Sequence, residues 1–433
     1  MLENKKTNIK WISSIPKEWK MGRLKDVIEV LTDYTANGSF GDLAKNVQYL
    51  DYEDYARLIR LTDLRDNLLN TGVYVSEESY EYLGKSKLFG GEILVANVGA
   101  YAGLFCEMPE VTAPATLGPN MFLIRTNQRM EQHFLYYLGN ANFVWEQLVQ
   151  KAISSAQPKL NKTDIKTIYI VIPPKNVQRK IASYLDQKCD KITTLIADVQ
   201  SEIDTLEQYK RSVIAETVTK GLNYDVKMKD SGVQWIGDMP AYWKCNRGKY
   251  ILKYIQKPVR EDDGVITCFR DGEVTLRSNR REDGFTMSDK EIGYQGIDVG
   301  DLVVHGMDGF AGAIGISDSR GKASPVLNVL DTEQNKKYIM YYLRSMAYSD
   351  VFIALATGIR VRSCDLRWNK LAELPYPIPP IEEQNAIVEH IDKVLEKTNA
   401  VIAEKKAQLE ILESYKKSLI YEYVTGKKEV PQQ

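Results

Sequence analysis

The chain has 433 residues, 44% of them hydrophobic, which is enough for two or three domains with separate cores. Lysine and arginine total 57 against 58 aspartates and glutamates, so the formal net charge is -1. This balance excludes a polybasic tail or a wholly cationic coat, and any contact with nucleic acid must use local basic patches.

The amino-terminal segment predicts a protein that is neither secreted nor held in a membrane. Its first residues, MLENKKTNIKW, lack the apolar core of a signal peptide, and no stretch approaches the ~18 apolar residues of a membrane span. The five cysteines form no CxxC pair and have no short spacing to histidine, so neither a disulfide framework nor a zinc site is predicted. These features indicate a soluble, unprocessed protein of the reducing cytoplasm, without a membrane partner.

The first part of the chain, residues 1–165, is predicted to be rich in β-strands. Short apolar or β-branched runs occur at RLIRL (57–61), EILVANV (92–98) and MFLIR (121–125). Gly, Asp and Asn separate these runs, and a helix is predicted over residues 133–150. This pattern is typical of a sheet-rich α+β domain.

A long helix is predicted next, from the residue after Pro174 to about Thr219, because this stretch contains no Gly or Pro. Its apolar residues step alternately by four and three, apart from one interruption at Lys210, and a sustained period of 3.5 residues indicates a coiled-coil seam. At 1.5 Å per residue the helix should be roughly 60 Å long. The predicted seam of this helix includes Leu185, Ile192, Ile196, Val199, Ile203 and Leu206.

The same order of elements follows in the second part of the chain. Residues 225–375 contain strand-like runs such as GVITCFR (264–270) and DLVVHGM (301–307), and a helix is predicted over 337–356. A second long helix is predicted from about Glu382 to Thr425. Its seam includes Ile391, Leu395, Ile402, Leu409 and Leu412.

These parallels come from an internal repeat, in which the ends of each half are alike and the middles have diverged. The matching segments are residues 9–23 with 233–247, 91–103 with 300–312, 170–186 with 376–392, and 206–219 with 412–425. Such a pattern predicts two domains that share one structural framework. Their different interiors would perform different versions of the same function.

The two long helices are predicted to pair with each other. A helix with an apolar seam needs a partner, and its own repeat supplies one of equal length. An antiparallel pair related by an approximate twofold axis would act as a spacer, with the two sheet-rich domains at its opposite ends. The alternative, two unrelated solvent-exposed helices, leaves both seams unexplained.

The sequence offers no catalytic residue, metal ligand or cofactor site. None of the three histidines, His133, His305 and His390, has neighbours at a spacing typical of metal or acid/base sites. The two Pro-Pro pairs lack the preceding Asn or Asp of a methyltransferase tetrad, and GFAGAIG (309–315) is not followed by a long helix. The chain is therefore predicted to do no chemistry of its own.

Basic residues cluster inside the two sheet-rich domains and just before each long helix. Arginine suits both guanine edges and phosphates, so these clusters are candidates for DNA contact, although any single one could be ordinary surface charge. The candidates are Arg57, Arg60, Arg65, Lys159, Lys162, Arg270, Arg277, Arg280, Arg281, Arg360, Arg362 and Arg367.

Three features together carry a family resemblance: the central stretch TKGLNYDVKMKDSGVQWIGDMPAYW (219–243), the paired IPPxxxQ segments ending at Gln178 and Gln384, and the two helical repeats. The chain resembles the specificity subunits of type I restriction-modification enzymes. One departure is Val177, which stands where the family usually has an acidic residue, as Glu383 is in the second segment. This difference is expected to alter a local contact with a partner.

The resemblance implies a non-catalytic subunit that binds double-stranded DNA. Each of two target recognition domains would read one half of a split, asymmetric site, and the paired helices would set the gap. The helices would also dock methyltransferase (modification) subunits, and restriction/translocase subunits would complete an ATP-dependent endonuclease. The implied regions are 1–165, the first target recognition domain; 166–224, the first conserved helical region and linker; 225–375, the second target recognition domain; and 376–433, the second conserved helical region and tail.

Two other functions remain open at this point. The first is a coiled-coil adaptor whose domains bind protein rather than DNA. The second is an enzyme whose nuclease or methyltransferase site is not recognisable in the sequence. DNA binding in the absence and presence of a methyltransferase partner distinguishes all three.

Overall fold

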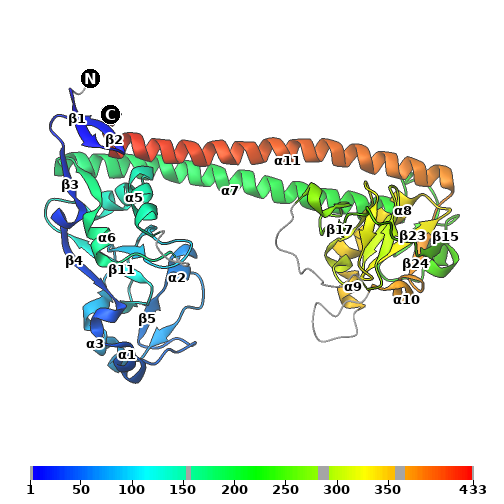
Figure 1. Cartoon of the computed structure of the whole chain (residues 1–433), viewed down its shortest axis with the longest axis horizontal. Helices are drawn as coiled ribbons and strands as arrows, with labels where there is room; N and C mark the ends of the chain where they lie inside the picture. The colour runs from blue at the N-terminus through cyan, green and yellow to red at the C-terminus, as the bar shows by residue number, and fades with distance from the viewer. Residues whose placement is uncertain (1–2, 153–157, 281–291, 356–365, 432–433) are drawn as a thin grey trace. The chain divides into compact units, whose positions relative to one another are not determined.

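A computed structural model of the chain forms two compact units. The first unit combines Met1–Val199 with Gln408–Gln433, and the second is Gln200–Ala407. Both units mix helices and strands, which confirms the predicted α+β class. Each is described by itself below (Figure 1). The residues that the structure describes are 3–152, 158–280, 292–355 and 366–431.

Two four-stranded sheets form the body of the first unit. The strands are β1 (Asn4–Ile9), β2 (Ile12–Pro16), β3 (Lys20–Arg23), β4 (Ile28–Asp33), β5 (Ala56–Ile59), β6 (Tyr74–Val75), β7 (Lys87–Leu88), β8 (Ile93–Ala96), β9 (Phe105–Glu107), β10 (Ala115–Leu117), β11 (Met121–Thr126) and β12 (Tyr169–Ile172). The short helices are α1 (Phe40–Asn46), α2 (Leu61–Arg65), α3 (Glu77–Tyr82), α4 (Gln132–Gly139), α5 (Asn142–Ala152) and α6 (Lys162–Thr167). One sheet has the antiparallel order β4-β11-β8-β9, and the other has the order β6-β5-β10-β7 with β5 and β10 parallel.

The second unit repeats part of this architecture. Its strands are β13 (Met228–Asp230), β14 (Asp238–Pro240), β15 (Lys244–Arg247), β16 (Leu252–Ile255), β17 (Ile266–Cys268), β18 (Val274–Leu276), β19 (Gln295–Ile297), β20 (Leu302–His305), β21 (Ile314–Ile316), β22 (Gly321–Ala323), β23 (Leu327–Thr332) and β24 (Pro375–Ile378). Its short helices are α8 (Lys336–Tyr348), α9 (Val351–Ala354) and α10 (Trp368–Leu371).

The sheet β16-β23-β20-β21 has the same antiparallel order as β4-β11-β8-β9, and the pair β15-β24 matches β3-β12. The remaining strands differ, since the parallel β5–β10 pair has no counterpart in β17-β18 or β19-β22. The two units therefore share a four-stranded sheet and a two-stranded pair, which together form the frame, and they differ in their remaining strands.

The central strands of the shared sheet are apolar on both faces because both faces are covered. In β8, Ile93 and Val95 join the core that includes the α4 and α5 side chains, while Leu94 joins a separate core on the other face. Side chains alternate across a strand, so three consecutive apolar residues serve two cores. Strand β20 shows the same alternation in the second unit.

Both short helical stretches predicted from the sequence are interrupted. The single helix predicted over 133–150 is wrong at Asn140, whose side-chain amide donates to the Phe105 carbonyl at 2.9 Å and separates α4 from α5. The helix predicted over 337–356 breaks at Asp350, which has φ +55° between α8 and α9. Residue 356 lies outside the described residues.

The two long helices have the predicted ends. They are α7 (Lys175–Lys220) and α11 (Ile381–Val424). Each begins after a Pro-Pro pair, since proline cannot donate a helical hydrogen bond, and each ends near a glycine with positive φ, Gly221 at +78° and Gly426 at +70°. Neither they nor any other helix within the described ranges has the length of apolar sequence that a membrane crossing requires.

In the first unit the two long helices run antiparallel. The Tyr423 hydroxyl donates to the Tyr184 hydroxyl at 3.2 Å, and the Lys416 ammonium donates to the Thr193 hydroxyl at 2.6 Å. A later residue of α7 thus meets an earlier residue of α11. The chain termini share this unit, because α11 ends in the core that contains β2 and α5 side chains.

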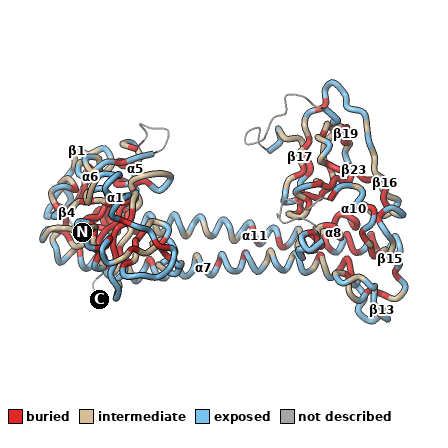
Figure 2. Tube along the Cα trace, turned by 90° about the horizontal axis from the view of Figure 1, so that it is seen from below, coloured by how far each residue is buried: buried red, intermediate tan, exposed pale blue. Residues whose placement is uncertain are grey.

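In the second unit the helices are also in contact, through an ion pair between Lys405 and Glu202. Lys405 and Thr398 stand at seam positions; Thr398 is buried, and its hydroxyl donates to the Val394 carbonyl at 2.8 Å. Along the middle turns of α7 and α11, buried positions come only at intervals (Figure 2). The predicted seam positions are all buried or half-buried: Leu185, Ile192, Ile196, Val199, Ile203, Leu206, Ile391, Leu395, Ile402, Leu409 and Leu412.

Candidate nucleic-acid interface

Two of the arginines predicted to contact DNA in the first unit are bonded within the fold. Arg57 on β5 donates to the backbone oxygens of Leu68 at 2.9 Å and Asn70 at 3.1 Å. Arg60 forms a two-point pair with Asp63 at 3.0 and 2.8 Å. Burial of Asp63 disfavours its charge, yet the hydrogen bonds from Arg60 and Asn70 and the charge of Arg60 together outweigh burial and hold the pKa of this carboxyl below its usual value. Both arginines fix the loop that follows β5.

The third predicted arginine, Arg65, is exposed and stacks on an aromatic ring. Its guanidinium carbon lies 4.2 Å from the ring centroid of Tyr101, which is itself exposed. Lys159 pairs through its backbone with Val98, three residues before Tyr101. The structure thus brings Arg65 and Lys159 to one loop at the end of β8, where a cation and an aromatic face are both available to a nucleic acid.

In the second unit, predicted arginines gather around an open hollow of about 570 Å³. Arg280 lies with its guanidinium carbon 4.2 Å from the Phe269 ring centroid and pairs with Asp271 at 2.6 Å. Arg270 pairs with Asp308 at 2.9 Å. The hollow is therefore lined by cations that carboxylates orient from within the fold. The predicted residues that line it are Arg270, Arg277 and Arg280.

Two of the basic residues predicted just before the long helices have local roles, each within its own unit. Lys162 begins α6 and pairs with Asp33 at 3.0 Å. Arg367 is the exposed N-cap residue of α10, in the place that Asn161 takes before α6. The other predicted residues lie outside the described residues: Arg281, Arg360 and Arg362.

His133, for which the sequence suggested no partner, connects α4 of the first unit to α7. The His133 ring on α4 contacts Glu107 at 2.5 Å and Asp186 of α7 at 2.6 Å. Hydrogen bonds to Glu107 and Asp186 outweigh burial and raise the pKa of His133 to about 9. Asp186 also accepts from the Tyr137 hydroxyl at 2.7 Å.

The second unit makes the same joint with different side chains. Asp392 of α11 takes the place of Asp186 and pairs with Lys337 at 2.8 Å. It also accepts a hydrogen bond from the Tyr341 hydroxyl. Sequence reasoning missed both aspartates, although they end the matched segments 170–186 and 376–392. A polar residue that recurs at the same position in both repeats was the available signal.

The paired glutamines that end the IPPxxxQ segments hold a second joint. Gln178 is fully buried and donates to the Pro173 carbonyl at 2.8 Å, while its side-chain oxygen accepts from the backbone N–H of Glu131 at 2.7 Å. Gln384 repeats these bonds with the Pro379 carbonyl at 2.9 Å and the N–H of Asn335 at 2.9 Å. Each glutamine ties the start of a long helix to the turn before α4 or α8.

The departure at Val177 falls on a contact within the fold. Glu383 accepts a hydrogen bond from the indole N–H of Trp243 at 3.0 Å and from the Tyr242 hydroxyl at 3.1 Å. Val177 packs against the core of the first unit. An altered contact with a partner stays a prediction.

Another of the three histidines, His305, has a structural role. His305 accepts backbone N–H bonds from Met307 at 3.2 Å and Asp308 at 2.9 Å, and burial lowers its pKa. Among the residues described, no three His, Cys, Asp or Glu side chains are grouped as a metal site would need.

Comparison with known proteins identifies the frame that these joints hold together. Residues 16–205 match the family model described as "Type I restriction modification DNA specificity domain". The putative type I restriction enzyme MjaX specificity subunit of Methanocaldococcus jannaschii is 24% identical over 96% of this chain and 95% of its own length. Over nearly its whole length, this chain is similar to the specificity subunits of type I restriction-modification enzymes.

Further matches agree with this similarity. The type I restriction enzyme MjaVIII specificity subunit of the same organism is 21% identical over 95% of this chain and 93% of its own length. A chain from the structure titled "Structural basis underlying complex assembly and conformational transition of the type I R-M system" shares the fold, with a TM-score of 0.65, 16% identity and coverage of 96% of this chain and 99% of that one. The family model is named for DNA specificity and both relatives are named as specificity subunits, so the similarity supports a DNA-specificity role.

Proposed function

We propose that this chain is a specificity subunit that reads a two-part, asymmetric sequence in double-stranded DNA, one half with the recognition domain of each unit. The observation that carries the proposal is the shared sheet order around different interiors. Each interior presents a different cation and aromatic pair, Arg65 with Tyr101 in the first unit and Arg280 with Phe269 in the second. Because the two recognition domains present different side chains on the same sheet framework, they are suited to binding two different half-site sequences.

The recognition domains correspond to residues 1–165 and 225–375, and the helical regions to 166–224 and 376–433. The helices set the gap between the half-sites and dock methyltransferase subunits, and restriction subunits join them in the cytoplasm. The exposed faces of α7 and α11 support this assignment, because a helix pair buried only along a narrow seam leaves most of its surface for partners.

The test is to select bound sequences from random DNA duplexes, using the chain together with the modification subunits of its own system. Two unlike half-sites at a fixed gap are expected. A single palindrome would overturn independent reading by the two domains, and no binding to DNA would favour a protein-binding adaptor.

Variants in the first unit separate a DNA contact from a structural arginine. Arg65→Ala should weaken DNA binding and leave the melting temperature unchanged, because the Arg65 guanidinium is exposed. Arg57→Ala should lower the melting temperature, because it removes the bonds that hold Leu68 and Asn70. If Arg65→Ala has no effect on DNA affinity, the Arg65–Tyr101 surface is not part of the interface.

A further inference from the structure

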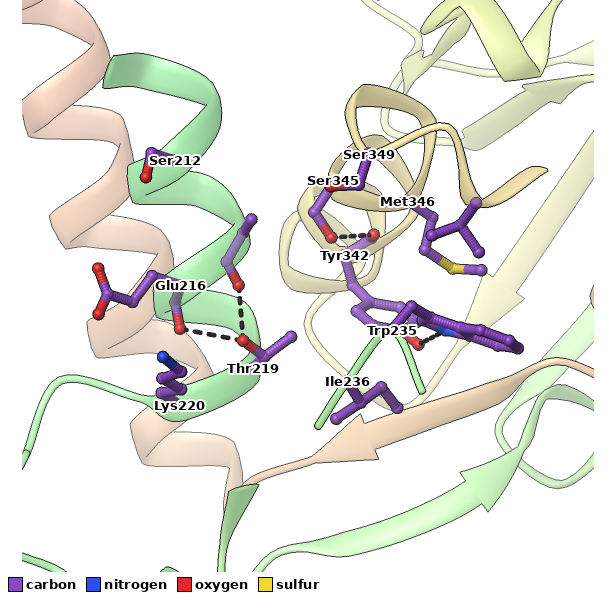
Figure 3. A pocket seen from close by; sticks show the side chains of 12 residues that line it. Ser212, Glu216, Thr219, Lys220, Trp235, Ile236, Tyr342, Ser345, Met346 and Ser349 are labelled. Carbon is purple, nitrogen blue, oxygen red and sulfur yellow. Dashed lines mark hydrogen bonds between the residues drawn. The ribbon is translucent and has the colours of Figure 1, made fainter. Parts of the chain in front are cut away.

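The end of α7 borders an open hollow of about 470 Å³ in the second unit. One wall is the turn of α7 that carries Glu216 and Thr219, and the other is formed by Trp235 with Tyr342 and Met346 of α8 (Figure 3). Ala215 of α7 also lines the hollow. The indole N–H of Trp235 donates to the Tyr342 hydroxyl at 3.2 Å, which holds two aromatic rings at the border. The volume is ample for a ring, since a cavity of ~150 Å³ already holds benzene.

The internal repeat shows which side chain occupies the equivalent position in the first unit. Residues 206–219 match 412–425, so Tyr421 of α11 is the counterpart of Ala215. In the first unit, Tyr421 packs against that unit's core and contacts the Phe143 ring of α5 at 6.3 Å between centroids, in an edge-to-face arrangement. A methyl group stands at this position in the second unit. The hollow beside α8 therefore lies where the repeat predicts a tyrosine side chain.

The polar groups around the two positions indicate the surroundings that this tyrosine would have. In the first unit, the Lys427 ammonium lies 4.3 Å from the Tyr421 ring centroid, and Glu422 pairs with Lys428 at 2.8 Å. The counterpart of Glu422 is Glu216, which borders the hollow and is exposed. Glu216 and Lys220 both border the hollow, and of the two the Glu216 carboxylate is complementary to a basic residue next to an aromatic one.

We propose that the hollow bordered by Ala215 receives a tyrosine side chain, with a basic residue beside it, from a partner polypeptide. The ring would lie against Trp235 and Met346, and the hydroxyls of Ser212 and Ser349, which also line the hollow, suit its phenol group. This proposal concerns a polypeptide contact of the second unit and does not depend on how DNA is read.

The direct test measures binding of N-acetyl-tyrosyl-lysine amide to the full chain by ligand-observed NMR, with N-acetyl-alanyl-lysine amide as the reference probe. The tyrosyl probe should bind and the alanyl probe should not. Ala215→Tyr should weaken binding at least about tenfold, since the new ring occupies the hollow as Tyr421 does in its own unit. Ser201→Tyr adds the same ring at an exposed position of α7 and should leave binding unchanged.

Two further variants show whether a loss of binding in Ala215→Tyr comes from the filled hollow or from a folding defect. Ser349→Leu narrows the entrance from an exposed position and should also weaken binding. Tyr421→Ala should open an equivalent hollow in the first unit and double the tyrosyl probe bound at saturation. Equal binding to the unmodified chain and to Ala215→Tyr or Ser349→Leu would overturn the proposal, as would an unchanged stoichiometry in Tyr421→Ala.

Cross-linking tests whether the occupant is a polypeptide. A photoreactive p-benzoylphenylalanine in place of Lys220, an exposed residue that borders the hollow, is activated in the chain assembled with its modification and restriction subunits on DNA. A cross-link to a peptide that contains tyrosine near lysine or arginine is expected. A cross-link to DNA alone, or none to protein, would contradict the assignment.

Discussion

Replacing Ile203 with aspartate should destabilise the second unit strongly. Only 5% of the Ile203 side chain is exposed, so the variant loses nearly all of the ~1.5–3 kcal/mol that burial of an isoleucine contributes. The carboxylate also has to lose water among apolar neighbours, which brings the expected loss to about 3–5 kcal/mol in the free energy of unfolding. Ile196→Asp should cost about half as much, because Ile196 is only half-buried.

Urea unfolding followed by circular dichroism measures these losses, and Ser201→Asp is the matched control. Ser201 is exposed on the same helix, so its aspartate should change the free energy of unfolding by no more than about 0.5 kcal/mol. The defect of Ile203→Asp should shrink at acid pH, where the introduced carboxyl is neutral. If Ile203→Asp unfolds at the same urea concentration as Ser201→Asp, the seam does not stabilise the helices.

Three other perturbations test the joints and the helices. The contribution of His133 should be fully present below the unfolded-state pKa of about 6.5 and be lost as pH rises through about 9, so melting curves of His133→Gln and the unmodified chain should converge above that pH. Gln178→Ala and Gln384→Ala should each cost about 1–3 kcal/mol in urea unfolding, because each leaves buried backbone groups unpaired; a change near zero would contradict the joint. Inserting four residues after both Ile203 and Leu409 adds about 6 Å of helix and should lengthen the selected gap by one or two base pairs, whereas altered half-site bases would disprove the spacer role.

Local rules explain why the long helices were predictable. Proline before the first turn, glycine after the last and a seam with a period of 3.5 residues fix the extent of α7 and α11 without reference to the rest of the fold. Gly139 and Asn140 also signalled the end of a helix, but the apolar pattern of residues 133–150 favoured one continuous helix. A strong period hides a break when the interrupting residues are few.

The roles of the arginines were harder to predict, because they depend on partners that only the folded chain supplies. Arg60 and Asp63 are three residues apart on one turn, so their pairing was readable from spacing. Arg57 bonds to backbone oxygens 11 and 13 residues away, and no side-chain pattern signals such acceptors. His133 likewise meets acids that lie 26 and 53 residues away.

The division of the chain into units has a consequence for its biosynthesis. The second unit is one uninterrupted stretch, Gln200–Ala407, whereas the first needs the segment that begins at Gln408. A ribosome therefore completes every residue of the second unit before it delivers the side chains that α11 contributes to the first core. Until translation ends, the apolar surface that receives those side chains stays open to water. The unit whose synthesis begins first is the last to close.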